Sequence, residues 1–476
     1  MKLKKLVMAT AISSALVTMV GCTSDGDSST INIDETINNT TTNDTTSNTG
    51  VGSPSTCPSW AASRPIDSDS MNVCQVPANI MINRTLTSDT VWYMEATVTV
   101  GNGNSEMSLT EGTLESGDEV ASVVLTIEPG TEIKGATGSF ANMIITRGSQ
   151  IQAVGTASAP IIFSSDDEGY DGSGEWGGLI LHGYGVHNEC LIADAGAVAC
   201  NVDSEGESGF AGGYTTDDNS GTLEYVIVTE GGFEFAPGNE INGISFVAVG
   251  SGTNIDYIQV NSNADDGLEF YGGDVSAKHL VITGALDDSV DWDEGWQGDL
   301  QHVLVVQSPD TAGNTIEADT EGTLDFLSKP TIANATFIGD GETDTLAVFK
   351  KTSGGFVHHS VFTGAAASLI TTCIDSSAAA VSGTELVFTN VVADCATSGD
   401  LVLLPAPITD VALAADYSSQ AAESIAVGAP DITDINATYA ESVADPAFFD
   451  VTDYAGAVNP DGSDVWYQGW TLDGTL

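Results

Sequence analysis

Seven short segments from residue 223 onward repeat one pattern, in which an aromatic, histidine or asparagine residue is followed by alternating apolar residues. Equivalent positions in successive segments are separated by 32, 22, 23, 32, 25 and 31 residues. A repeat of this length with one strand in register per unit is typical of a solenoid. The equivalent residues, which we call the first column, are Tyr225, Tyr257, His279, His302, Asn334, His359 and Asn390.

A second column runs through the same repeats, in the segments NGISFV, DGLEFY, DSVDWD, NTIEAD and DTLAVF. Its first residues are Asn242, Asp266, Asp288, Asn314 and Asp344. The third and fifth residues of each segment are apolar, and side chains two positions apart point to the same face of a strand. Two or more strands per repeat predict an all-β fold, a parallel β-helix whose third and fifth positions face inward.

The first 21 residues have the organisation of a secretory signal peptide, with the basic MKLKK before the apolar LVMATAISSALVTMV. Gly21 directly precedes Cys22, which resembles the cleavage site of bacterial lipoproteins, although Met19 stands where leucine is usual. We expect Cys22 to be a lipid anchor; the alternative is an ordinary secretory signal with a chance cysteine. Thr23 and Ser24 resemble the sorting pattern for the outer membrane, where we expect the protein on the periplasmic or cell-surface face. No later segment is long and apolar enough to span a bilayer.

Residues after Cys22 are rich in Ser, Thr, Asn and Asp and poor in apolar side chains, which is typical of a flexible tether. Short β-branched and aromatic runs begin near residue 76. The expected organisation is therefore a signal peptide at 1–21, a tether at 22–56, a cap with the first strands at 57–118, the β-helix at 119–400 and a C-terminal capping segment at 401–476.

Six cysteines follow Cys22 and fall into three pairs that are local in sequence. An even number in an exported chain suggests three disulfides. Metal binding is the alternative, but the chain has no CxxC spacing and no histidine near enough to complete a site. The simplest pairing is Cys57–Cys74, Cys190–Cys200 and Cys373–Cys395.

Three stretches, LTIEPGTEIKG (125–135), IITRGSQIQAVGTASAPIIFSS (144–165) and EWGGLILHGYG (175–185), resemble the opening coils of right-handed parallel β-helix proteins of the pectin-lyase-like type. The stretches at 239–260, 265–280 and 454–471 resemble more specifically a little-characterised family of exported Gram-negative proteins, many of them lipoproteins. The resemblance implies a right-handed parallel β-helix and an exported location, but no established reaction.

The chain carries 67 acidic and 11 basic residues, for a formal net charge of −56. Loss of the three lysines in the signal peptide would lower it to −59. Such a surface repels nucleic acid, so we expect no nucleic-acid partner. It favours divalent cations, cationic partners or solubility in salty water.

Carboxylates recur at the fourth and sixth positions of the second column, which alternate with the inward positions and are expected to point outward. Neighbouring coils lie about 4.8 Å apart, so these carboxylates repel one another, and no lysine in these strands relieves the repulsion. We expect a Ca²⁺ ion here; the alternatives are solvated acid with bulk counterions and a catalytic carboxylate pair. The first-position residues are expected to form a ladder of turns. The expected metal ligands are Asp265, Glu269, Asp287, Asp291, Asp293, Glu294, Glu317 and Asp319.

Tyr271 is expected to point outward beside this acid and is our candidate for stacking against a sugar, whereas Trp292 occupies an inward position. The function favoured by the sequence is a noncatalytic binding module anchored to the membrane by lipid, with a glycan or an outer-membrane protein as partner. The rival is a polysaccharide-active enzyme on the same scaffold. Its support is weak because the Gly-His-Gly motif of pectinolytic hydrolases is absent, and we name no catalytic residue.

Overall fold

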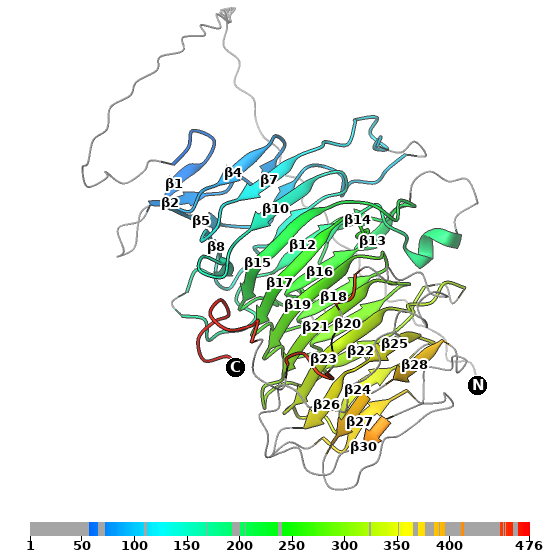
Figure 1. The fold of residues 1–476 in the computed structure, drawn as a ribbon. Coiled ribbons are helices and arrows are strands. Elements are labelled where there is room, and N and C mark those ends of the chain that lie inside the picture. Colours follow the sequence, from blue (N-terminus) through cyan, green and yellow to red (C-terminus); the bar gives the residue numbers. More distant parts are fainter. Residues whose placement is uncertain are drawn as a thin grey trace, which may run out of the picture. The chain divides into compact units, whose positions relative to one another are not determined.

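A computed structural model confirms the expected parallel β-helix. Successive coils stack along one axis, from the blue strands at one end to the orange strands at the other (Figure 1). The expected lipid anchor Cys22, the tether and Asn390 of the first column lie outside the described residues. The residues that the structure describes are 57–64, 72–108, 112–167, 169–192, 200–204, 206–236, 240–322, 325–350, 352–364, 370–376, 385–389, 391–395, 411–413, 448–450, 452, 454–459 and 465–476.

One face of the β-helix is a ten-stranded sheet in which all neighbours are parallel. In spatial order its strands are β3 (Asn79–Ile80), β6 (Val98–Val100), β9 (Met143–Ile145), β12 (Leu179–His182), β16 (Ile244–Val247), β18 (Leu268–Tyr271), β20 (Val290–Asp293), β22 (Ile316–Ala318), β24 (Thr345–Phe349) and β27 (Thr372–Asp375).

An 18-stranded sheet forms the rest of the wall, and its strands are parallel except for the pair β1–β2. The strands are β1 (Ala62–Arg64), β2 (Asn72–Gln75), β4 (Arg84–Leu86), β5 (Thr90–Met94), β7 (Val124–Ile127), β8 (Glu132–Gly135), β10 (Gln150–Val154), β11 (Ile161–Ser165), β15 (Gly221–Thr229), β17 (Asn254–Asn261), β19 (Ser276–Thr283), β21 (Asp299–Val306), β23 (Thr331–Gly339), β25 (Gly355–His358), β26 (Val361–Gly364), β28 (Leu386–Thr389), β29 (Val391–Asp394) and β30 (Val411–Leu413).

The first column marks a bend that divides each long strand of this sheet into two halves. The first half of β15 pairs with β10 and its second half with β11, so each coil has three sides. At the bend the backbone takes positive φ, which is uncommon for residues other than glycine and is tolerated best by Asn, Asp and His. The φ angles are 50° at Tyr225, 53° at Tyr257, 49° at His279, 59° at His302, 52° at Asn334 and 45° at His359.

The interior of the coils is filled by the inward positions of the second column. Leu268, Phe270 and Val290 are at most 1% exposed, and Trp292 is fully buried as predicted. Phe270 stacks on Trp296 with ring centroids 4.1 Å apart. These contacts join neighbouring coils, so the apolar periodicity read from the sequence is the periodicity of the core.

The register of the second column is confirmed from β16 to β22 and slips by one residue at β24. Ile316 pairs with Ala347, where the sequence alignment placed Leu346. The slip turns Phe349 inward, where it is fully buried and meets Trp292 edge-on at 5.8 Å. Burying a phenylalanine in the core accounts for the change, because an outward Phe349 would lose this contact.

The three disulfides have the predicted pairing. Their Cα–Cα distances are 5.6, 5.5 and 5.4 Å for Cys57–Cys74, Cys190–Cys200 and Cys373–Cys395.

The described residues of an insertion between β12 and β15, within 183–220, lie over the outer face of the ten-stranded sheet. The insertion contains the 3₁₀ helix η1 (Asn188–Ile192), the disulfide Cys190–Cys200 and an antiparallel pair, β13 (Val202–Ser204) and β14 (Gly209–Ala211). The backbone N–H of Gly273 donates to the carbonyl of Val186 at 2.6 Å. Outward side chains of the sheet are therefore covered by protein.

Most of the C-terminal segment 401–476, which we expect to be a cap, lies outside the described residues. Its described residues, within 448–476, lie along the side of the 18-stranded sheet, and the red trace runs beside the green coils (Figure 1). Val458, Tyr467 and Trp470 pack on the outward apolar residues Ile227 and Val281. Those residues would otherwise expose apolar surface, which explains why the segment lies there.

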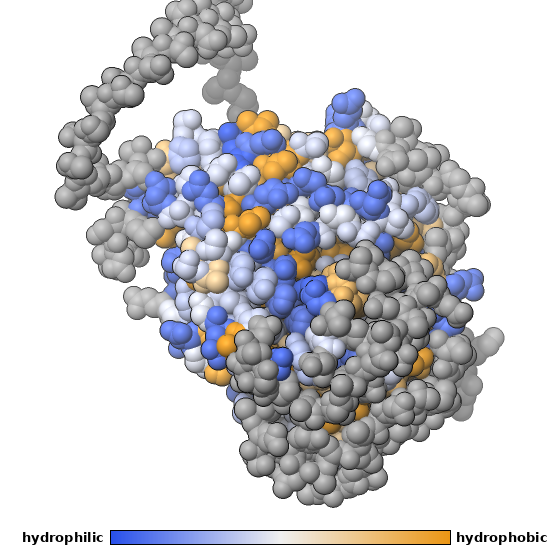
Figure 2. Space-filling model, in the orientation of Figure 1, coloured by the Kyte–Doolittle hydropathy of each residue, from blue (hydrophilic) through white to orange (hydrophobic). Residues whose placement is uncertain are grey.

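Hydrophilic residues predominate on the visible face of the described chain, with smaller hydrophobic areas among them (Figure 2). Among the described residues, the large apolar side chains that are exposed are Met81, Ile82, Val154, Tyr170 and Leu476. No helix in the described part of the chain has the length and apolar character needed to cross a membrane.

Candidate functional site: an acidic ladder

Carboxylates of consecutive coils lie in register on the ten-stranded sheet and on the turns that precede its strands. Glu269 of β18 pairs with Asp291 of β20, which pairs with Glu317 of β22. We call the whole set the acidic ladder. It consists of Asp265, Asp266, Glu269, Asp287, Asp288, Asp291, Asp293, Glu317, Asp319 and Glu321, which form four groups whose oxygens lie within 4.8 Å of one another inside each group.

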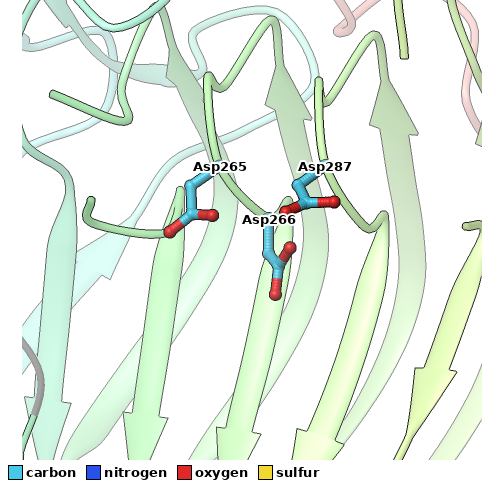
Figure 3. A group of neighbouring side chains, drawn as sticks. All are labelled: Asp265, Asp266 and Asp287. Atoms are coloured by element: carbon cyan, nitrogen blue, oxygen red, sulfur yellow. The ribbon is translucent and has the colours of Figure 1, made fainter. Parts of the chain in front are cut away.

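The first group is at the turns. Asp265 and Asp287 hold equivalent places on neighbouring coils, and Asp266 lies between them with its carboxylate close to theirs (Figure 3). Asp266 is 6% exposed, whereas Asp287 is exposed. The group therefore reaches from solvent into the wall of the β-helix.

Asp291 belongs to two groups at once. With Asp266 and Glu269 it forms one group, and with Asp288 and Glu317 the next. Its Oδ1 is buried and has no hydrogen-bond partner. A buried anionic oxygen without a partner destabilises the folded state unless a proton or a cation accompanies it.

Burial raises the pKa of Asp266 well above its usual range, and the carboxylates of Glu269, Asp291 and Asp288 add to the effect. Burial likewise raises the pKa of Asp291 well above its usual range, followed by repulsion from Asp288. For Asp288, burial raises the pKa to about 7, although the backbone N–H of Asn314 lowers it. Near neutral pH these carboxylates therefore bind protons, which a cation could displace.

One lysine does relieve the repulsion, which corrects the expectation from the sequence. Lys350 forms an ion pair with Glu317, and its charge lowers the pKa of both Asp288 and Asp291. Lys350 follows β24 directly, and its backbone N–H donates to the carbonyl of Ala318 at 2.8 Å. That position places it beside Glu317, so the Glu317 end of the acidic ladder has its own counter-cation.

The fourth group is Asp293, Asp319 and Glu321, at the other end of the strands. Asp319 is 4% exposed. Glu294, an expected metal ligand, is in none of the four groups; its carboxylate contacts Nε2 of the buried His187. Glu294 thus connects the insertion to the sheet.

The expected exposure of Tyr271 is wrong, because the side chain is only 8% exposed. Its ring packs with Ile180, Ile241 and Val247 beneath the insertion, and its hydroxyl donates to Oε2 of Glu269. Glu269 is also 8% exposed, so it lies beneath the surface together with Tyr271. Tyr271 is a partner of the ladder, and its ring has no open face on which a sugar could stack.

The sequence assigned Asp266 and Asp288 only to the turns, and it missed Glu321. Asp266 does have the turn role, since its Oδ1 accepts the backbone N–H of Asp288 at 2.9 Å, but it also belongs to two of the groups. Its place at the first position of the second column, directly after Asp265, was the available signal. Glu321 lies in a turn beyond β22 and follows no repeat that could have marked it.

The arrangement presents a row of hard oxygen donors on adjacent coils, of the kind that Ca²⁺ prefers. Two pockets in the described part of the chain, of about 340 and 220 Å³, are lined by other residues. The site is thus defined as a set of carboxylates in the wall of a parallel β-helix, some buried and others reaching solvent.

The fold and this site define an acidic parallel β-helix protein. A family model described as the pectate-lyase-like β-helix domain matches residues 113–471, which is more than half of the chain. The chain belongs to that family. Searches of curated proteins and of solved structures found no match.

Proposed function

We propose that this protein is a noncatalytic binding module, exported and anchored by lipid, whose acidic ladder holds Ca²⁺. The observation that carries the cation is the buried, unpartnered Oδ1 of Asp291, which lies among carboxylates of both neighbouring coils. Ca²⁺ takes six to eight oxygen ligands in flexible geometry, so it suits ligands that come from successive strands.

The group of Asp266, Glu269 and Asp291 is the principal cation site in this proposal. Oδ1 of Asn242 supports the choice, because this side chain is 1% exposed, its Nδ2 contacts Glu269, and its oxygen has no hydrogen-bond partner. The neighbouring group at Glu317 already has the ammonium group of Lys350. A cation at the first group would offset the repulsion that raises the pKa of Asp266 and Asp291.

The location in this proposal comes from the signal peptide and from Cys22, which would hold the body at the outer membrane. A rigid β-helix on a polar tether of more than thirty residues presents a broad surface away from the lipid. The partner in this proposal is a glycan or an outer-membrane protein. The net charge of the chain disfavours nucleic acid and anionic membrane surfaces.

One observation favours an enzyme as the second candidate. Asp288, with a pKa of about 7, could donate a proton at neutral pH, and the carboxylates of Asp291 and Glu317 lie within 4.8 Å. Asp288 is only 4% exposed, however, and general acid catalysis requires contact with the substrate. We therefore favour the binding module.

Thermal unfolding of the compact unit 53–476 tests the cation. Millimolar Ca²⁺ should raise Tm above its value in EDTA, and above the value with equal Mg²⁺, since ligand at 100 times Kd stabilises by about 2.7 kcal/mol. The variant Asp291→Asn should lose this increase. Asp310→Asn, which removes the same charge at an exposed turn, should keep it. An equal response to Mg²⁺, or none, would contradict a calcium site.

The binding role is tested separately with the same protein on a panel of neutral and acidic polysaccharides. Retention on a polysaccharide without release of reducing ends or unsaturated products is the result expected for a binding module. Product release that is lost in Asp288→Asn would instead establish the enzyme.

A further inference from the structure

Four rings of the first column stack along the outside of the 18-stranded sheet, and we call them the ring column. The centroid distances are 4.3 Å for Tyr225–Tyr257, 4.2 Å for Tyr257–His279 and 5.0 Å for His279–His302, with planes within 10° of parallel. Because φ is positive at each position, these side chains depart from the alternating inward and outward directions of the strand. The rings therefore form one continuous surface across four coils.

The described residues of 448–476, which we call the C-terminal strap, cover this surface. Trp470 meets Tyr225 edge-on at 5.7 Å, and Trp466 meets His279 at 5.1 Å. Nδ1 of His302 lies 3.3 Å from the carbonyl oxygen of Ala457 and donates to it. The strap thus touches both histidines directly.

Polar contacts hold the strap along its length, among them an ion pair of Asp450 with Lys278 and a hydrogen bond from the backbone N–H of Gly456 to the carbonyl of His359 at 2.7 Å. The backbone N–H of Leu472 donates to Gln259 at 2.8 Å, and that of Asp450 donates to Gln301 at 2.8 Å. The strap adds no strand to the sheet and has no disulfide among the described residues. Its attachment depends on ring packing, on the Asp450–Lys278 ion pair and on hydrogen bonds of side chains and backbone.

We propose that the C-terminal strap is a cover that acid releases from the ring column, with His302 as the group that takes up the proton. A second proton on the imidazole of His302 would give it a positive charge, 5.0 Å from the ring of His279. His302 is only 5% exposed, so water could not solvate this charge while the strap is in place. With the strap released, water would solvate the imidazolium group of His302.

The charges around the two rings determine the sign of the effect. Asp256 accepts from Nδ1 of His279 at 2.7 Å, and Asp450 of the strap pairs with Lys278 at 2.6 Å. Burial, with a smaller contribution from His279, lowers the pKa of His302 to about 4, although the carbonyl of Ala457 and the carboxylate of Asp450 act in the opposite direction. The released state therefore binds more protons between about pH 6.5 and 4, so a fall in pH through this range favours release. The titratable groups that face the rings are Glu224, Tyr225, Asp256, Tyr257, Lys278, Asp450, Tyr454 and Tyr467.

Hydrogen exchange of the full chain from pH 7.5 to 4, corrected for intrinsic rates, tests the proposal. Protection of the strap should fall at least tenfold, with a midpoint between pH 4 and 6.5, while β17 to β21 stay protected. Fluorescence of the strap tryptophans should change with the same midpoint. Added Ca²⁺ should leave this transition unchanged.

Two variants and a matched control complete the experiment. His302→Gln retains a donor for Ala457, and His279→Phe retains the stacked ring, so each should fold and lose part of the acid response. His182→Gln changes a fully buried histidine of the other sheet and should retain the full response. Undiminished strap protection at pH 4, loss of strap and sheet protection together, or a normal acid response in both column variants would overturn the proposal.

Discussion

Asp266 and Asp288 occupy equivalent turns one coil apart, and Oδ1 of Asp266 accepts the backbone N–H of Asp288 at 2.9 Å. Asp288 in turn accepts the backbone N–H of Asn314. Each carboxylate thus secures the next coil while it also brings negative charge close to its neighbours. Stability of the turns and repulsion in the ladder come from the same side chains.

The variants Asp266→Asn and Asp266→Ala separate these two effects. Asparagine retains the acceptor for the N–H of Asp288 and removes the charge, so the protein in EDTA at pH 8 should become more stable. Alanine leaves a buried N–H without a partner, which should cost about 1–3 kcal/mol. Urea unfolding of both variants measures the difference, and equal stability would contradict the turn role.

A pH series in EDTA tests the charge at Asp288. Its pKa of about 7 in the folded state exceeds the ordinary 3.8, so the folded protein binds more protons between these values. Stability contributed by this group should therefore fall as pH rises from about 4 to 7. Each unit of pKa difference corresponds to about 1.4 kcal/mol.

Asp288→Asn provides the comparison for that series. It should match the wild type at pH values well below 3.8, where Asp288 is protonated in both states, and exceed it by a few kcal/mol at pH 8. Millimolar Ca²⁺ should reduce this gap. Parallel curves for the two proteins would show that Asp288 is ionised in the folded state throughout.

The register of the ladder could be predicted because its residues alternate with core residues on strands of one repeat. Leu268, Val290 and Ile316 fix the inward face, and their neighbours then follow from the period of two. The pairing of the six cysteines could also be predicted, because the two members of each pair are close in sequence.

The burial of the ladder could not be predicted in this way. Glu269 and Tyr271 point outward from their strand, but Tyr271 packs in a cluster with Ala211 of the insertion, and Glu269 contacts Asn242 and Tyr271. The insertion has no repeat to align. The strap hides the outward residues of the other sheet by a similar contact between distant segments. The ion pair of Lys350 with Glu317 could not be predicted, because Lys350 follows a strand whose register slips by one residue.

Arg147 should be essential for holding the insertion. Its guanidinium is fully buried and donates to the carbonyl oxygens of Gly103 at 2.7 Å and Cys200 at 2.6 Å. Arg147→Lys keeps the charge but loses the planar fork, so it should destabilise by about 3 kcal/mol or more. Chemical denaturation measures the cost, and a change below 1 kcal/mol would contradict this account.

Opening the disulfide Cys190–Cys200 should loosen the insertion between β12 and β15 without unfolding the coils of the β-helix. A closed loop of this length contributes about 2–3 kcal/mol in the chain-entropy model. In the double variant Cys190→Ser/Cys200→Ser, hydrogen exchange should quicken in the insertion while β18 and β20 stay protected. Loss of protection throughout the ten-stranded sheet would show that the insertion is part of the core.

Removal of Lys350 should make the ladder more dependent on a divalent cation. Lys350 pairs with Glu317 and lowers the pKa of Asp288 and Asp291, so Lys350→Met leaves these carboxylates without their only lysine partner among the described residues. The variant should be less stable than the wild type in EDTA at pH 8 and should bind Ca²⁺ at least several-fold more tightly, because one unit charge about 4 Å away contributes about 1 kcal/mol in water and about 4 kcal/mol near a protein surface. Lys329→Met is the matched control, since Lys329 pairs with Glu385 at 2.7 Å outside the ladder. Calorimetric titration with Ca²⁺ compares the three proteins. An unchanged affinity in Lys350→Met, or the same gain in Lys329→Met, would show that the cation does not bind near Glu317 and Asp291.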